Sequence, residues 1–273
     1  MRRVILGVLR LAWRLARGLW WVLAGLLICA LLFPWLEHPR RMRVVGWWSR
    51  RMLNAVGVRL HVHGQFGVQH EAGGGSGLLL VSNHVSWLDI LAIGAVCPAR
   101  FVSKSEVRRW PVVGWLAASA GTLFLQRGQR RAAARMGEEI AASLAEGSTV
   151  ALFPEGTVGD GRRLLPFHAN LFQSAIKAGT HLLPVAIRYA DEATASAGSE
   201  VVAFDRLEPS NAVAYDGDIT VVQSVRKVLA ARGLAVHVMA VRPALHPSHA
   251  NHDRRAFADE ARRRIAKALG EDC

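Results

Sequence analysis

Cysteine is scarce in this 273-residue sequence, and the three present are far apart. Cys29, Cys97 and Cys273 form no C-x-x-C pair. This spacing argues against a disulfide framework and against a structural zinc site, and a reducing compartment explains it most simply. The sequence also lacks the G-x-S-x-G pattern that carries the nucleophile of serine lipases. A lipase with a serine nucleophile is therefore disfavoured.

Acidic residues are almost absent from the first 60 positions, which contain eleven arginines and the single acid Glu37. Six of the nine tryptophans lie in the same stretch, whereas residues 61–273 are nearly balanced, with 23 basic and 20 acidic side chains. Arginine attracts anionic headgroups and indole rings settle at the bilayer boundary, so this composition indicates a membrane surface. Nucleic acid is disfavoured, because the charge is interleaved with leucine and tryptophan and no nucleic-acid motif is present.

The same region predicts two apolar helical segments. Residues 4–17 space arginines at helical intervals, as in an amphipathic helix lying in the membrane interface. Residues 19–36 carry no charge and are just long enough to cross a bilayer. A cleaved signal peptide is the rival, but no A-x-A-like site follows. Arginines flank residues 19–36 on both sides, so a hairpin that turns near Pro34 within one leaflet is favoured over a single span, with both clusters on the cytoplasmic face.

From about residue 57 the sequence alternates between strand-like and helix-like segments, which predicts an α/β fold with a central, largely parallel sheet flanked by helices. We therefore expect membrane-anchoring helices over 1–56 and a catalytic domain over 57–273. A turn is expected over 71–77. The expected strands are 58–64, 78–83, 99–104, 121–127, 148–156, 181–189 and 234–241, and the expected helices are 86–96, 129–146, 167–179 and 254–269.

Polar residues follow three of the expected strands at their carboxyl ends. LLLVS is followed by Asn83 and His84, TLFLQ by Arg127, and VALFP by Glu155 and a Gly-Thr pair. In open α/β sheets, ligands bind outside the carboxyl ends of the strands. One crevice is therefore expected to hold an imidazole, a guanidinium and a carboxylate.

Simpler explanations exist for each of these residues taken alone. Ser86 and Asp89 fit the S-x-x-D pattern of a capping box, so Asp89 is either a helix cap or the partner of His84. A lone histidine after a strand is more often a structural hydrogen-bonding group than a base. His246, His249 and a third histidine at 252 lie in a polar, proline-containing stretch that we expect to be a surface loop. No metal site is expected.

Four short blocks resemble those of the glycerolipid acyltransferases, the 1-acylglycerol-3-phosphate acyltransferase family. They are NHVSWLD, GTLFLQR, FPEGT and LLPVAI, in the family's order and spacing, over about residues 78–190. The resemblance implies transfer of a fatty acyl group from an acyl thioester to the free hydroxyl of a lysophospholipid. The acceptor it favours is 1-acyl-sn-glycerol 3-phosphate, which gives phosphatidic acid.

The chemistry of these residues fits such a reaction. His84 is the expected general base and Asp89 its orienting partner. Without a serine elbow, the acceptor hydroxyl is expected to attack directly. The donor is acyl-coenzyme A or acyl carrier protein, with no cofactor. The resemblance implies that substrate is bound by Lys104, Gly121, Arg127, Glu155, Gly156, Thr157 and Pro184.

The sequence departs from the family pattern near the expected acceptor region. Val158 and Gly159 stand where many members have Arg-Ser, and residues 167–170 read Phe-His-Ala-Asn instead of Phe-Lys-x-Gly. Arg162 or Arg163 could replace the lost charge. A lyso-ornithine lipid or another lyso-lipid is therefore an alternative acceptor. The rival functions are a membrane-bound thioesterase or hydrolase that uses the same pair, and a non-catalytic peripheral membrane protein.

Overall fold

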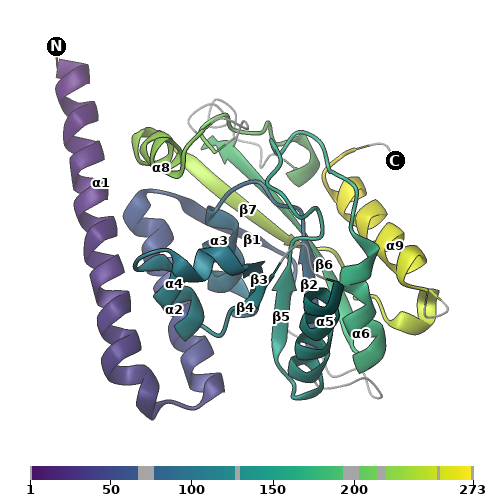
Figure 1. Cartoon of the computed structure of the whole chain (residues 1–273). Coiled ribbons are helices and arrows are strands. Elements are labelled where there is room, and N and C mark those ends of the chain that lie inside the picture. The colour runs from purple at the N-terminus through teal and green to yellow at the C-terminus, as the bar shows by residue number, and fades with distance from the viewer. Residues whose placement is uncertain are drawn as a thin grey trace.

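The computed structural model describes residues 2–66, 77–126, 130–192, 203–213, 219–250 and 253–271. Within them a seven-stranded sheet runs in the order β1-β7-β6-β2-β5-β3-β4, with helices on both faces (Figure 1). Neighbouring strands are parallel except for β6 and β7. The predicted α/β fold with a largely parallel sheet is therefore confirmed. The strands are β1 Arg59–His63, β2 Leu78–Ser82, β3 Arg100–Lys104, β4 Leu123–Leu125, β5 Thr149–Leu152, β6 His181–Asp191 and β7 Leu234–Ala240.

The helices cover the sheet in two layers, and the central strand β2 supplies side chains to both. Leu78 and Leu80 pack with residues of α2, α3 and α8, whereas Leu79 and Val81 pack with residues of α5, α6 and α9. Successive strand side chains point to opposite faces, so a strand covered on both sides is apolar throughout. The helices are α1 Arg2–Leu27, α2 His38–Val56, α3 Leu88–Val96, α4 Val113–Ser119, α5 Arg130–Ala145, α6 Gln173–Ala178, α8 Val221–Ala230 and α9 Arg254–Ala268.

Each expected strand corresponds to one of β1 to β7, and α3, α5, α6 and α9 match the expected helices. The 167–179 segment begins as a 3-10 turn, Ala169–Phe172, before α6. Helix α8 was missed, although Thr220 and Gln223 form a full capping box at its start. The expected turn at 71–77 lies outside the described residues, apart from its last glycine.

The N-terminal segments form a helical hairpin (Figure 1). The two segments expected at 4–17 and 19–36 are instead one helix, α1, because no proline interrupts it before Pro34. It continues through a π-helical turn, Ile28–Leu32, and a 3-10 turn, Phe33–Trp35, before α2 returns alongside it. The stretch Ile5–Trp35 contains an 18-residue window with a mean hydropathy of 2.0, and by length and composition it could cross a membrane.

Specific contacts hold the two helices of the hairpin together and pack the hairpin on the rest of the chain. The indole of Trp48 on α2 donates a 2.8 Å hydrogen bond to the carbonyl of Trp21 on α1. Arg14 on α1 donates to the carbonyl of Leu229 (3.0 Å) and to a second carbonyl at the C-terminus of α8. Leu53, near the end of α2, belongs to the same apolar cluster as β2. The division of the chain at residue 56 stays a prediction about its two parts.

Candidate active site

The candidate site lies at the carboxyl edge of the parallel strands. Because β2, β5, β3 and β4 run parallel, their carboxyl ends meet at one edge, with β2 and β5 adjacent. This places His84, after β2, next to Glu155, after β5. The end of β4 is three strands from β2, roughly 14 Å at a strand spacing of about 4.8 Å. Arg127 lies outside the described residues.

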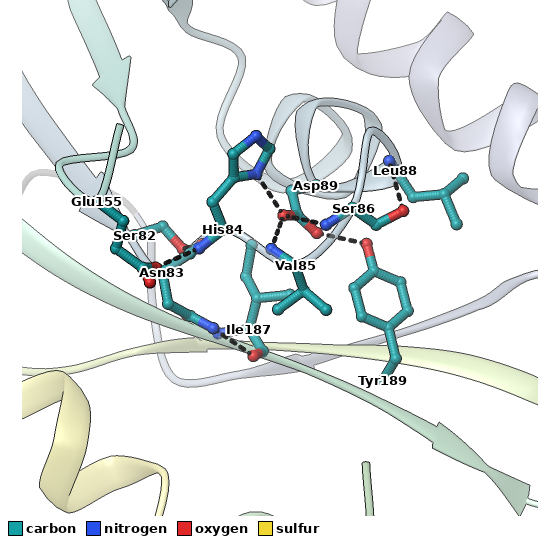
Figure 2. A network of polar contacts seen from close by, with 10 residues as sticks. All are labelled: Ser82, Asn83, His84, Val85, Ser86, Leu88, Asp89, Glu155, Ile187 and Tyr189. Atoms are coloured by element: carbon teal, nitrogen blue, oxygen red, sulfur yellow. Dashed lines mark hydrogen bonds and ion pairs between the residues drawn. The ribbon is translucent and has the colours of Figure 1, made fainter. Parts of the chain in front are cut away.

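His84 and Asp89 form a hydrogen-bonded pair. His84 Nδ1 lies 2.8 Å from Asp89 Oδ2, and Figure 2 shows the imidazole standing above the carboxylate. Asp89 is fully buried, whereas 17% of the His84 side chain is exposed. An ionised carboxylate only accepts hydrogen bonds, so His84 Nδ1 carries the hydrogen and Nε2 presents a lone pair. This arrangement leaves Nε2 able to accept a proton.

Asp89 also holds the turn that leads into α3, whose N-cap is Trp87. Its Oδ2 accepts the backbone N–H groups of Val85 (2.7 Å) and Ser86 (2.9 Å). This is half of the predicted capping box. The other half differs, because the Ser86 hydroxyl accepts from Leu88 N at 3.3 Å, and Asp89 N donates to the Ser86 carbonyl. The capping box is therefore only half formed, and the same oxygen that accepts from Val85 and Ser86 also holds the imidazole of His84.

Tyr189 completes the surroundings of Asp89. Its hydroxyl donates a 2.6 Å hydrogen bond to Asp89 Oδ1 (Figure 2). Burial, followed by the negative charge of Asp89, raises the pKa of Tyr189 well above its usual value, so the phenol stays protonated. Tyr189 was not predicted from the sequence. A phenol in a buried strand needs a hydrogen-bond partner, and that was the available signal.

Glu155 holds the backbone on the other side of His84. Its Oε1 accepts the His84 N–H at 2.8 Å and its Oε2 accepts the Leu165 N–H at 3.0 Å. Burial raises the pKa of Glu155 to about 7, against the opposing effect of these two backbone hydrogen bonds. Both carboxylate oxygens therefore position the chain around His84. The expected role of Glu155 in substrate binding stays a prediction.

The imidazole plane and the strand below it are also held in place. The His84 ring stacks on Phe153, with centroids 4.0 Å apart and an interplanar angle of 12°. The Asn83 side chain donates to the Ile187 carbonyl (2.9 Å) and accepts from its N–H (2.8 Å). A base whose backbone, ring plane and tautomer are all held requires little reorganisation during a reaction.

The other predicted substrate-binding residues have varied settings. Lys104 is exposed at the end of β3, and Thr157 is exposed after β5. Gly121 and Gly156 have φ angles of +81° and +68°, which favour glycine. Pro184 is buried in β6, beside Val81 of β2. Lys104, Gly156 and Thr157 lie at or beyond the carboxyl ends of β3 and β5 and Pro184 lies within β6, whereas Gly121 precedes β4, at the opposite end of that parallel strand. The substrate contacts of all five residues stay predictions.

The segment that departs from the family pattern lies against His84. Gly159 N donates to the His84 carbonyl at 2.7 Å. Arg163 lines a small pocket with His84, Glu155 and other residues, whereas Arg162 donates to Asn211 at 2.9 Å. Of the two arginines suggested by the sequence, Arg163 is the one that lines this pocket with His84.

Comparisons with known proteins agree on one family. The Acyltransferase family model matches residues 59–188. The lyso-ornithine lipid O-acyltransferase of Pseudomonas aeruginosa is 34% identical over 231 residues, 85% of this chain and 80% of the relative. The 1-acyl-sn-glycerol-3-phosphate acyltransferase of Neisseria meningitidis is 43% identical over 152 residues, 56% of this chain and 58% of the relative.

A solved structure shows the same fold. It is that of the 1-acyl-sn-glycerophosphate (LPA) acyltransferase PlsC from Thermotoga maritima, which is 18% identical, with a TM-score of 0.62 and full coverage of both chains. The buried His84–Asp89 pair, the matching family model and the long alignment to the Pseudomonas relative lead to one conclusion. This chain belongs to the acyltransferase family.

Proposed function

We propose that this chain transfers a fatty acyl group from an acyl thioester to the free hydroxyl of a lyso-lipid. The observation that carries the proposal is the 2.8 Å contact between His84 and the buried Asp89 at the carboxyl edge of the sheet. A base held there can activate an alcohol, and the family transfers acyl groups. Acyl-coenzyme A or acyl carrier protein is the donor class, and the reaction needs no cofactor.

The proposed reaction proceeds by direct attack. His84 Nε2 takes the proton of the acceptor hydroxyl as its oxygen attacks the thioester carbonyl. The new C–O bond forms, the C–S bond breaks, and the imidazolium returns its proton to the leaving thiolate. Asp89 stabilises the imidazolium throughout. General base catalysis of this kind contributes about 10²–10⁴ in rate.

Two acceptors have support. The Neisseria relative, named for 1-acyl-sn-glycerol-3-phosphate, is the more similar over the matched region, and this remains our first candidate. The Pseudomonas relative, named for lyso-ornithine lipid, aligns over more of the chain. The changes at Val158 and Gly159 also favour a different headgroup. Arg163, beside His84, would pair with either a phosphate or a carboxylate.

The remaining grip on the acceptor is proposed from the family blocks. Arg127 would bind an anionic headgroup in a bidentate manner and Lys104 would add a second cation. We assign Glu155 a positioning role, because both of its oxygens accept backbone N–H groups. Each of these contacts acts on the acceptor or on His84, not on the acyl donor.

The hairpin would hold the site at a membrane. A row of large apolar side chains on α1 is exposed, including Trp13, Leu19 and Trp20, each more than 60% exposed. Such a surface is stabilised in lipid, because the lipid removes it from contact with water. We propose that the protein lies on the cytoplasmic face of the inner membrane, where lyso-lipid and product both reside.

A panel of lyso-lipids tests the proposal. Purified full-length protein is incubated with 1-acyl-sn-glycerol 3-phosphate or lyso-ornithine lipid, each with acyl-coenzyme A and with acyl carrier protein donors. Products are identified by mass spectrometry. We expect acylated lipid from at least one acceptor, and none from His84→Ala protein that retains its fold. Free fatty acid formed equally with and without acceptor would instead identify a thioesterase.

A further inference from the structure

A second histidine–carboxylate cluster lies on the side of the sheet that ends in the edge strand β1, away from His84. His61 is on β1, His237 is on β7, and Glu192 directly follows β6. One ligand atom from each of the three lies within 4.8 Å of the others. His61 Nε2 faces Glu192 Oε1, and the His61 and His237 rings stack with centroids 4.6 Å apart. Three neighbouring segments of the sheet therefore present ligand atoms at one place.

His237 has a buried nitrogen with no partner among the described residues. Only 8% of the residue is exposed. Its Nδ1 lies 3.1 Å from Nε2 of His63, whereas its Nε2 is buried without a hydrogen bond. An unsatisfied buried polar atom costs free energy, and native structures contain few of them. The nitrogen left over by the His63 contact is one that a ligand could satisfy.

We propose that His61, His237 and Glu192 form a binding site for a divalent transition-metal ion of the zinc class. Two imidazoles and a carboxylate are a usual ligand set for zinc, with water as the fourth ligand. The ligand atoms lie within 4.8 Å of one another, against the roughly 3.4 Å expected between ligands about 2.05 Å from a tetrahedral ion, and His61 Nε2 is already closer than that to Glu192 Oε1. The half-exposed side chain of His61 can move away from Glu192 to make room for the ion.

Two neighbours, His63 and Arg59, support this assignment. His63 would accept from Nδ1 of His237 and so leave the lone pair of its Nε2 for the metal, while Arg59 pairs with the second oxygen of Glu192. Such outer contacts orient metal ligands. Arg188, which stands beside His237 in the strand register, adds an opposing positive charge. Its two Nη nitrogens donate to backbone carbonyls of residues 204, 205, 207 and 269, whereas its Nε, like His237 Nε2, is buried without a hydrogen-bond partner in the described part of the chain.

A metal here would tie the edge strand β1 to β7 and to the end of β6. Residues 188 and 189 point to opposite faces of β6. The site therefore lies on the face opposite Tyr189 and the His84–Asp89 pair. A bound ion is therefore expected to raise the thermal stability of the protein and to change kcat little. No metal site was expected from the sequence, in which His61, Glu192 and His237 are far apart and form no ligand spacing.

Zinc binding to chelator-treated, full-length protein tests the proposal. Isothermal titration calorimetry should show one ion per chain for the wild type. His237→Gln and His61→Gln should each weaken binding by more than the roughly 10–100-fold that loss of an outer contact causes. Cobalt should give the absorption bands of a tetrahedral site, and zinc should raise the melting temperature of the wild type but not of His61→Gln. His61→Gln, at the sheet edge, keeps the test valid if His237→Gln does not fold.

The matched control is His246→Gln, which removes a histidine from the C-terminal loop and not from the cluster. It should bind zinc as the wild type does. The proposal is overturned if the wild type binds no zinc, because the cluster is then only an ion pair. It is also overturned if binding survives in both His61→Gln and His237→Gln, or is lost in His246→Gln. None of these readouts depends on acyl transfer.

Discussion

The chain contains two histidine–carboxylate pairs whose surroundings differ. In the central pair, Asp89 is fully buried and His84 is mostly buried. In the edge pair, 44% of the His61 side chain and 19% of that of Glu192 are exposed, and Arg59 shares the carboxylate. The residue chemistry is similar, but the central carboxylate accepts hydrogen bonds from four groups, including the imidazole.

This difference indicates what makes such a pair suited to proton transfer. Asp89 is held by two backbone N–H groups and by Tyr189, so it cannot turn away from His84. Phe153 holds the ring plane and Glu155 holds the His84 backbone. The edge pair stacks on the buried His237, but its own side chains and that of Arg59 are partly exposed and can move. Its chemistry suits a ligand that draws the side chains together, and not a preorganised base.

The largest expected contrast is between Asp89→Asn and Glu192→Gln. Asp89→Asn removes the charge that stabilises the imidazolium, so kcat should fall on the order of 10⁴-fold. Glu192→Gln is the matched control at the other pair and should leave kcat within about twofold, because it lies on the opposite face of the sheet. Steady-state acyl transfer checks both. Equal losses in the two variants would show that the pairs do not differ in function.

The next contrast concerns the pH dependence of stability. The folded pKa of Glu155, about 7, is above its ordinary value of 4.5. The folded state therefore binds more protons between these values, and the free energy of unfolding should fall as pH rises through that window, by about 3 kcal/mol from this group. Urea unfolding at pH 4.5 and pH 7 measures the change.

Glu155→Gln is the control for this prediction. It cannot titrate, so its free energy of unfolding should lack this part of the pH dependence. It should be less stable at pH 4.5, because one of the two backbone N–H groups loses its acceptor. A wild type and a variant with the same pH dependence would contradict the burial effect on Glu155.

The smallest expected effect is that of Tyr189→Phe. The ring stays in place but Asp89 Oδ1 loses a donor. We expect kcat to fall about tenfold, equivalent to the loss of one hydrogen bond of roughly 1.4 kcal/mol, with KM unchanged. A general loss of structure would raise KM or lower the yield of folded protein. An unchanged kcat would show that the two backbone donors alone hold the carboxylate.

Much of the fold was predictable because local patterns carry it. The apolar run of β2 and the alternating segments after residue 57 predicted the strands and most of the helices. The antiparallel pairing of β6 with β7 was not predictable, because strand direction depends on where the chain returns after residue 192. Within the candidate site, the resemblance of NHVSWLD and its companion blocks to the family pointed to His84 and Asp89, whereas nothing pointed to Tyr189, since its contact with Asp89 spans 100 positions.

The sequence by itself determined the class of fold, the position of the His84–Asp89 pair and the apolar N-terminus, because periodicity, spacing and composition are local properties of a chain. The tertiary structure decided what surrounds each pair. Hydrogen bonds and burial join residues that are distant in sequence, such as Asp89 with Tyr189 and His61 with His237. Only the packed sheet determines which carboxylate is enclosed and which is left at an open edge.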